Sequence, residues 1–248
     1  MTSESSVLAG VWNNFPLAGL GSVAHAAGYR LAVLDYEHGV FTTESAFAQV
    51  QQLKAEGVTV FVKPGTNTRW FVQQALDHGA DGVIIPHVEG AVHAAEIAGY
   101  TKFAPDGTRS AASGTQTRFR AVGHRWMEEE NARVLCIPMI ERATALEQIE
   151  DIVAEENVDG IFIGSADLSL SRGRGAYART AEDFADFARI AAVCVAAGKP
   201  WGIGGWVSEE REFARAHGAT WIVTCMDFTA LEQGMRLAIA DVPEAVVS

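Results

Sequence analysis

Two acidic residues, Glu141 and Asp167, each follow a strongly apolar segment and are of a type that binds divalent metals. Carboxylate oxygens are the ligands that Mg²⁺ and Mn²⁺ prefer, and two of them leave positions for water and for a chelating substrate. We therefore expect this pair to hold a divalent cation. The alternative is structural, with the two acids pairing with Arg142 or capping the helices that follow them.

A histidine with acidic neighbours offers acid–base chemistry in the segment DYEHG. His38 lies three residues after Asp35 and directly after Glu37. A carboxylate beside an imidazole orients the ring and tunes its pKa, so His38 is a candidate general base. Lys63, at the end of the apolar segment TVFVK, adds a positive charge that could bind an anion.

The apolar pattern of the chain predicts a scaffold that brings these residues together. Eight segments rich in Val, Ile and Leu alternate with segments of helical periodicity, as expected for strands buried on both faces of a parallel sheet. They begin near Ala9, Gly28, Gly57, Gly79, Val134, Asn157, Gly198 and Gly218. We predict an α/β fold, a single (β/α)₈ TIM barrel over residues 1–248, with an open doubly wound sheet as the alternative. In a barrel, the residues that end the strands meet at one mouth.

Composition and charge exclude several classes of protein. The chain has 248 residues, of which 48% are hydrophobic, and its net charge is −12 from 19 Lys and Arg against 31 Asp and Glu. This balance excludes a generally basic nucleic-acid binder and disfavours an anionic membrane surface. No window reaches about 18 uninterrupted apolar residues, and the three cysteines form no paired motif. We expect a cytoplasmic protein with no nucleic-acid or membrane partner.

A long irregular segment runs from about Tyr100 to Arg120 and concentrates positive charge. It contains Arg109, Arg118 and Arg120 in an otherwise acidic chain. Connections of this length in a compact domain are usually functional or mobile. The segment is either a solvated surface loop or a lid that meets an anionic substrate.

Several motifs together resemble a known family. The segments DYEHG, IPMIE and VDGIFIGSADLSLSRG, with GADGVIIPHV and HGATWIVTCMD, resemble the HpcH/HpaI family of metal-dependent class II pyruvate aldolases over about Gly10 to Leu231. The resemblance implies a barrel of the phosphoenolpyruvate/pyruvate-domain type. It also implies a homohexamer, a trimer of dimers, in which the C-terminal helix is exchanged between subunits.

The resemblance further implies a carbon–carbon lyase that makes or cleaves 4-hydroxy-2-oxo acids through a pyruvate-type enolate and an aldehyde. Glu141 and Asp167 would ligate Mg²⁺ or Mn²⁺, with Co²⁺ or Zn²⁺ as other choices, and the 2-oxo acid would chelate that ion. His38, paired with Asp35, would transfer the proton. The substrates are therefore a small 2-oxo acid and an aldehyde.

The same resemblance assigns residues to substrate binding. Backbone amides around Gly164, Ser165 and Ala166 would cradle the substrate carboxylate, and Lys63 would supply a charge to the substrate. Trp12, in the first strand segment, is either a wall of this site or part of the core.

Three residues depart from the usual family pattern. Lys63 stands where the family usually has an arginine, Ser165 replaces a proline, and Met139 replaces a glutamine. Lysine supplies one compact charge where arginine binds bidentately, so the donor is pyruvate or a substituted 2-oxo acid. Gly204 and Trp206 predict a roomier acceptor pocket than in relatives.

Four alternatives stay open at the level of sequence. The chain could be a citrate-forming condensing enzyme of the same family, using the arginines from Arg109 to Arg120, or a Schiff-base aldolase using Lys63. The segment GLGSVA from Gly19, followed by Asp35, weakly matches a dinucleotide-binding motif of oxidoreductases, although fourteen residues separate Gly21 from Asp35 where roughly twenty are expected. A non-catalytic binding protein that keeps the fold is the fourth.

Overall fold

The eight apolar segments form the strands of a closed barrel in the computed structural model, which describes residues 7–240 and 242. Its strands are β1 Leu8–Asn13, β2 Leu31–Asp35, β3 Thr59–Lys63, β4 Gly82–Ile85, β5 Leu135–Ile140, β6 Ile161–Ile163, β7 Trp201–Gly204 and β8 Trp221–Met226. They follow one another in chain order, every pair is parallel, and β1 closes the sheet against β8. The predicted (β/α)₈ barrel is confirmed, and the open sheet is wrong. The outermost ends of the predicted domain, 1–6, 241 and 243–248, lie outside the described residues.

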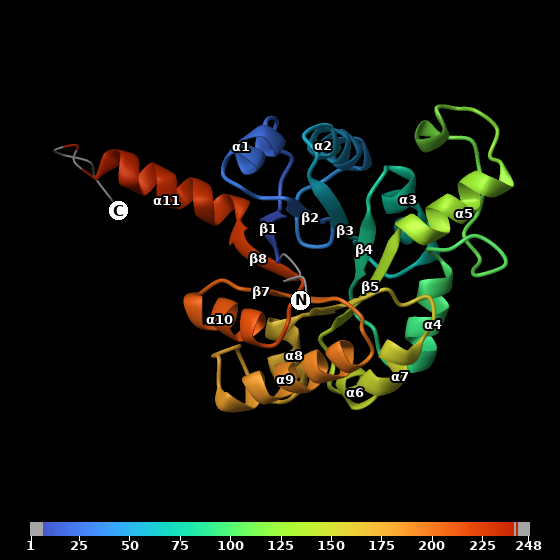
Figure 1. The fold of residues 1–248 in the computed structure, drawn as a ribbon. Coiled ribbons are helices and arrows are strands. Elements are labelled where there is room, and N and C mark those ends of the chain that lie inside the picture. The colour runs from blue at the N-terminus through green and yellow to red at the C-terminus, as the bar shows by residue number, and fades with distance from the viewer. Residues whose placement is uncertain (1–6, 241, 243–248) are drawn as a thin grey trace, which may run out of the picture.

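Helices connect the strands and surround them (Figure 1). They are α1 Leu20–Ala26, α2 Thr43–Ala55, α3 Arg69–Asp77, α4 Ala91–Gly99, the 3₁₀ turn η1 Thr115–Thr117, α5 His124–Arg133, α6 Ala143–Glu147, α7 Ile149–Ala154, α8 Ser165–Ser171, α9 Ala181–Ala196, α10 Ser208–Ala216 and α11 Asp227–Ile239. No helix among the described residues is long and apolar enough to cross a membrane.

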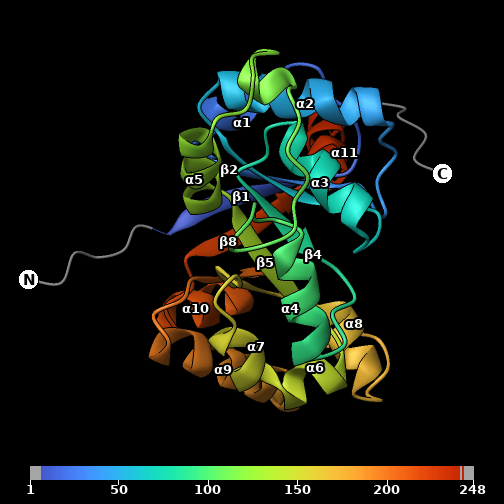
Figure 2. The ribbon, with the colours of Figure 1, turned by 90° about the vertical axis from the view of Figure 1, so that its right-hand side faces the viewer.

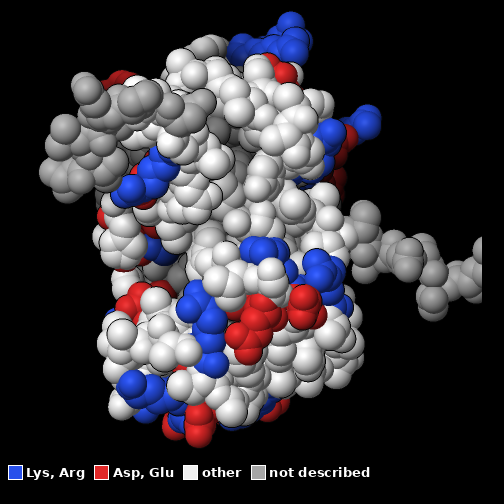
Figure 3. All heavy atoms as spheres, turned by 90° about the vertical axis from the view of Figure 1, so that its left-hand side faces the viewer, with Lys and Arg blue, Asp and Glu red and all other residues white. Residues whose placement is uncertain are grey.

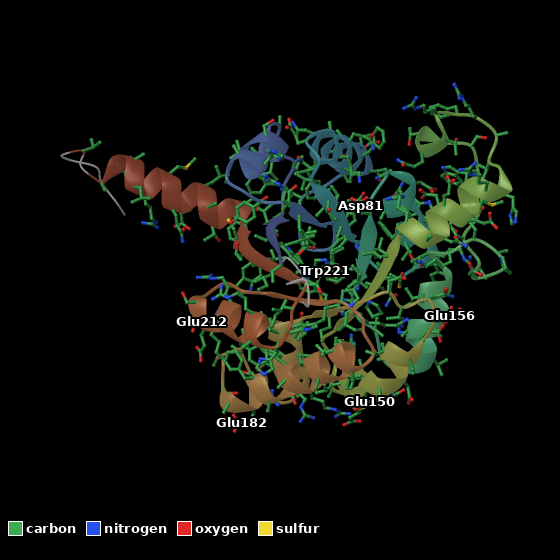
Figure 4. All side chains as sticks on the ribbon, viewed as in Figure 1. Asp81, Glu150, Glu156, Glu182, Glu212 and Trp221 are labelled. Carbon is green, nitrogen blue, oxygen red and sulfur yellow. The ribbon has the colours of Figure 1, made fainter. Side chains whose placement is uncertain are left out.

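The core has two layers, because side chains of a strand alternate between its faces. On β2, Leu31 and Val33 point into the barrel, whereas Ala32 and Leu34 pack against the surrounding helices. Trp221 lies among the strands (Figure 4) and fills the barrel, with its ring centroid 5.1 Å from that of Phe61.

The acidic surplus lies largely on the outside of the barrel. Glu150, Glu156, Glu182 and Glu212 are exposed at the periphery (Figure 4). Solvated acids of this kind account for much of the net charge without a role at the barrel mouth.

Helix α11 differs from the other helices because it extends away from the barrel (Figure 1). Asp227 is its only buried residue, and apolar side chains farther along are exposed, Met235 by 64% and Leu237 by 77%. The segment from Tyr100 to Arg120, together with α3 and α4, lies on the opposite side of the molecule (Figure 2).

Candidate active site

All nine site residues expected from the sequence line one cavity of about 220 Å³ at the mouth of the barrel. They are Trp12, Asp35, His38, Lys63, Glu141, Gly164, Ser165, Ala166 and Asp167. The cavity gathers them because each lies at or just after a carboxyl end of a parallel strand or, like Trp12, near the end of one.

Lys63 is the centre of a buried ion cluster. Its ammonium contacts the carboxylate of Glu37 and lies 3.4 Å from Oδ1 of Asp35, and its side chain is only 5% exposed. The register of β2 and β3 places Lys63 directly beside Asp35. A buried cation with two carboxylate partners avoids the cost of an unpaired charge.

Asp35 holds the turn that carries the histidine. Its Oδ1 accepts hydrogen bonds from the backbone N–H groups of Glu37 and His38, at 3.1 and 2.9 Å, and its Oδ2 accepts one from Nε1 of Trp12 at 2.9 Å. The expected pairing of Asp35 with His38 is therefore made through the histidine backbone. The His38 ring, 67% exposed, lies 3.6 Å from the carboxylate of Glu37 instead.

Glu37, for which we predicted no separate role, connects the basic groups of the mouth. Its carboxylate contacts Lys63 and lies 2.5 Å from Nε2 of His87, in addition to its approach to His38. Burial alone would raise the pKa of the Glu37 carboxyl, but the hydrogen bond and charge of Lys63, followed by those of His87, hold it below its ordinary value. Its position in the motif DYEHG, directly before His38, was the sequence feature that could have marked Glu37 as a site residue.

His87 also belongs to the site, and its backbone is unusual. Its φ of 57° is in the left-handed region, which residues other than glycine rarely adopt. This conformation lets its backbone N–H donate to Oε1 of Glu141 at 2.5 Å, while ring Nδ1 lies 3.2 Å from the same oxygen. Its position just after β4 was the sequence signal.

Glu141 and Asp167 form the acidic pair expected to hold a metal. Glu141 is 3% exposed at the end of β5, and Asp167 is exposed in the first turn of α8. Burial raises the pKa of the Glu141 carboxyl, and the negative charge of Asp167 adds to this, whereas the hydrogen bond and charge of His87 oppose it. No group of three or more His, Cys, Asp or Glu residues in the described ranges could hold a metal, so this pair offers two protein ligands.

The turn from β6 into α8 passes close to Glu141 because residue 164 is glycine. A Cβ at Gly164 would lie 2.7 Å from Cβ of Glu141. The Gly164 N–H donates to the carbonyl of Ile140 at 3.1 Å, so it is committed to the backbone. The expected amide cradle is thus reduced to Ser165 and Ala166, whose N–H groups open a helix and have no partner within it.

Trp206 lines the cavity beside Gly204, where a roomier pocket was expected. A Cβ at Gly204 would lie 2.5 Å from the Trp206 ring, so the indole fills the space that the glycine leaves. This ring meets Trp12 edge-on, at a centroid distance of 6.5 Å. The prediction of a roomier pocket compares this chain with its relatives, so it stays a prediction.

The arginines of the segment 100–120 do not line this cavity. The Arg109 side chain is buried, its Nη2 lies 2.8 Å from Oδ1 of Asp77, and its guanidinium stacks over Phe103. Arg118 and Arg120 are exposed. Arg109 therefore anchors the segment rather than meeting a substrate.

The two glycines of the GLGSVA segment have separate structural roles, since Gly19 has a left-handed φ of 85° before α1 and Gly21 serves helix packing. A Cβ at Gly21 would lie 3.1 Å from Cγ of Glu56 and 3.4 Å from Cα of Leu53, at the contact between α1 and α2. The carboxylate of Asp35 is occupied by Trp12, Lys63 and the following turn. Neither half of the dinucleotide motif is used in the way that an oxidoreductase requires.

Several known proteins are similar to this chain in sequence and in fold. A family model described as HpcH/HpaI aldolase/citrate lyase matches residues 9–227. A hydroxypyruvate/pyruvate aldolase of Sagittula stellata is 32% identical over 165 residues, 66% of this chain and 65% of that protein, just under two thirds of its length. A second hydroxypyruvate/pyruvate aldolase, of Deinococcus radiodurans, is 30% identical over 93% of this chain and 84% of its own.

A solved structure agrees with these sequence matches. The crystal structure of an HpcH/HpaI aldolase/citrate lyase family protein from Burkholderia cenocepacia J2315 is 28% identical, with a TM-score of 0.84 over 96% of this chain and 95% of that one. The chain belongs to the HpcH/HpaI aldolase/citrate lyase family.

Proposed function

We propose that this protein is a metal-dependent aldolase that makes or cleaves 4-hydroxy-2-oxo acids from a small 2-oxo acid and an aldehyde. The observation that carries the proposal is the meeting of two acids, a buried lysine and a histidine at one cavity of the barrel mouth. Two relatives that match this chain are named hydroxypyruvate/pyruvate aldolases, which supports the same chemistry.

The donor set of Glu141 and Asp167 fits a divalent cation. A buried carboxylate beside a second acid is destabilised by burial and by repulsion, and a bound cation relieves both. Mg²⁺ or Mn²⁺ suits two carboxylate ligands, with Co²⁺ or Zn²⁺ as further choices. Bound there, the cation supplies the Lewis acidity that stabilises the enolate oxygen of the 2-oxo acid.

In the cleavage direction, the 4-hydroxyl group loses its proton and the C3–C4 bond breaks. The aldehyde leaves, and the bonding electrons form the enolate, which takes up a proton at C3. His38 carries these protons, since it is the exposed ring at the rim of the cavity and has a carboxylate 3.6 Å away. Addition runs through the same enolate in reverse.

Lys63 and the start of α8 bind the substrate anion in this scheme. Lys63 contributes positive charge to a cavity whose acidic lining residues are Asp35, Glu141 and Asp167. The Ser165 and Ala166 amides receive the carboxylate. The amino group of Lys63 is engaged by Asp35 and Glu37, so it is not presented as a free nucleophile for a Schiff base. We assign the donor as pyruvate or a substituted pyruvate such as hydroxypyruvate.

The proposed assembly is a hexamer, a trimer of dimers, in which α11 is exchanged between subunits. The exposed apolar side chains of α11 support this, as does a shallow groove along the helix between Phe15 and Ile239. The face from which α11 projects also carries broad areas without charged side chains (Figure 3). The double variant M235E/L237E should lower the oligomeric mass measured by light scattering.

A panel of 4-hydroxy-2-oxo acids, assayed with Mg²⁺, Mn²⁺, Co²⁺ and Zn²⁺, tests the proposal. We expect cleavage that stops on addition of a chelator and returns with metal. Borohydride trapping of a pyruvate adduct on Lys63 would instead support a Schiff base. Citrate formation from oxaloacetate and an acetyl donor would support a condensing enzyme. Binding of NAD(H) would support an oxidoreductase. Absence of all these activities would support a binding protein.

A further inference from the structure

The acid that follows β8, Asp227, is buried but does not line the cavity at the barrel mouth. It is 3% exposed and is the first residue of α11, whereas Met226 is the residue of β8 that lines the cavity. A buried carboxylate is costly unless hydrogen bonds or opposite charges compensate for its lost hydration. The partners of Asp227 therefore indicate what it does.

Most of these partners belong to the segment that ends β1 and follows it. Nδ2 of Asn13 and the backbone N–H of Asn14 each donate to Oδ2 of Asp227 at 2.7 Å, and the N–H of Phe15 donates to the same oxygen at 3.3 Å. Oδ1 accepts from Nδ2 of Asn14 at 3.0 Å and from the N–H of Phe228 at 2.8 Å. Hydrogen bonds to a charged acceptor are the stronger class, so this segment is held firmly against the start of α11.

One residue of this segment also holds the chain just beyond His38. The carbonyl of Asn14 accepts a hydrogen bond from the N–H of Val40 at 2.8 Å. The same oxygen packs against Gly39, where a Cβ would lie 2.5 Å from it. The absence of a side chain at Gly39 lets the two backbones approach this closely. Asn14 therefore contacts both residues that follow His38.

The turn that carries His38 is thus held at both ends. The side chain of Asp35 fixes its start through the N–H groups of Glu37 and His38, and the backbone of Asn14 fixes its end. The ring of His38 is 67% exposed, so packing does little to hold it. The backbone of the turn therefore sets where the ring lies.

We propose that Asp227 is a positioning residue, which fixes Asn14 and through it the turn that carries His38. A group that transfers a proton must lie within hydrogen-bond reach of that proton, so a displaced turn lowers the rate. The inference rests on the proposed aldolase function for the role of His38. The physical link between Asp227 and the turn does not depend on that function.

Hydrogen exchange of the backbone amides of residues 36–41, followed by mass spectrometry, tests the link directly. Asp227→Asn puts an NH₂ group where both carboxylate oxygens accept hydrogen bonds, so we expect these amides to exchange at least about 10-fold faster. Gly39→Ala presses on the Asn14 carbonyl from the other side and should act in the same way, which also tests the link if Asp227→Asn does not fold. Asn14→Ala keeps both backbone hydrogen bonds of this residue and should change the rate less than about threefold.

Glu210→Gln is the matched control, because Glu210 is a second buried acid that holds a loop elsewhere. It is 0% exposed and accepts hydrogen bonds from Tyr177, Arg179 and the N–H of Val207. This variant should also be destabilised, but the amides of the His38 turn should exchange as in the wild-type protein. Equal acceleration in Glu210→Gln and Asp227→Asn would show a general loss of stability and overturn the inference. Wild-type exchange rates in Asp227→Asn would overturn it as well.

Exchange of pyruvate protons with deuterium measures the consequence for His38. In Asp227→Asn, kcat should fall about 10-fold, while KM for pyruvate and Kd for Mn²⁺ change less than about twofold, because Lys63 and the two metal-type acids are unchanged. A variant that loses protection of the turn but keeps the wild-type kcat would contradict a role in positioning His38. If the wild-type protein does not exchange pyruvate protons, the aldolase proposal fails, whereas amide exchange still decides whether Asp227 holds the turn.

Discussion

Basic residues in two regions of this chain have opposite fates in the fold. At the barrel mouth, Lys63 is buried with Asp35 and Glu37 and lines the main cavity. In the segment 100–120, where arginines are denser in the sequence, Arg109 is tied to Asp77 and contributes nothing to that cavity.

The difference shows that position relative to a strand is a better guide to which residues line the cavity than local charge density. A residue that ends a barrel strand is placed by the register of the sheet, as when β2 and β3 set Lys63 beside Asp35. The position of a residue in a long connection depends instead on the contacts that its side chain makes. We expect substitutions in the two regions to differ accordingly, by orders of magnitude at the mouth and little in the segment.

Among substitutions that compare the two regions, replacement of Lys63 should have the largest effect. In Lys63→Ala, kcat should fall about 10²- to 10³-fold, because the charge that we propose binds the substrate anion is lost. Metal binding should persist, since Glu141 and Asp167 are unchanged. The loss of a buried partner of two acids should also cost about 3–5 kcal/mol of unfolding free energy. Single-turnover kinetics, metal titration and chemical unfolding measure these three quantities.

Lys63→Arg is the matched control because it keeps the charge and introduces the arginine that the family resemblance led us to expect there. Its turnover should exceed that of Lys63→Ala. Unchanged catalytic efficiency in Lys63→Ala would remove this residue from the mechanism and with it the contrast between the two regions.

The sequence predicted the barrel and the residues of the mouth because both follow from strand ends. Eight apolar segments form the strands, and the polar residues directly after them lie at the mouth of the barrel. Contacts made by side-chain direction could not be predicted in this way. The ring of His38 approaches Glu37 rather than Asp35, and His87 joins the site through a left-handed backbone that its sequence neighbours do not specify.

Glu37→Gln should have an intermediate effect, with activity lower by about 10-fold, because Glu37 orients Lys63 and both histidines without holding the metal. Its pKa in the folded protein lies below the ordinary value of 4.5. The ionised carboxylate therefore contributes stability that is complete above that value and is lost as the pH falls through the lowered pKa.

Unfolding measured from about pH 6 to about pH 3 checks this dependence. The wild-type protein should lose stability more steeply than Glu37→Gln as the solution is acidified. Parallel curves for the two proteins would show that Glu37 does not form the ion cluster in solution.

The smallest effect is expected in the segment 100–120. Arg118→Ala combined with Arg120→Ala should change kcat/KM less than about twofold and stability by no more than about 0.5 kcal/mol, as for exposed sites without specific contacts. Steady-state kinetics and thermal unfolding suffice. A loss greater than tenfold would mean that the segment acts on the cavity of a neighbouring subunit, and the contrast with the barrel mouth would then fail.

The contacts that glycines and tryptophans make also could not be predicted from the sequence. Gly204 suggested free space at the cavity, whereas the ring of Trp206 packs against this glycine. Gly164 read as part of an amide cradle, yet its N–H is bonded to Ile140. Both outcomes depend on how neighbouring strands approach each other, which periodicity does not encode.

Exchange of the methyl protons of pyruvate with deuterium, followed by NMR without any aldehyde, tests the central claim most directly. The account predicts exchange that requires a divalent cation and that falls in Glu141→Gln by about 10³-fold, since several kcal/mol of enolate stabilisation is lost. Glu150→Gln, at an exposed acid that does not line the cavity, should exchange like the wild-type protein. Exchange that continues with chelator present, or that survives in Glu141→Gln, would contradict a metal-stabilised enolate at this site.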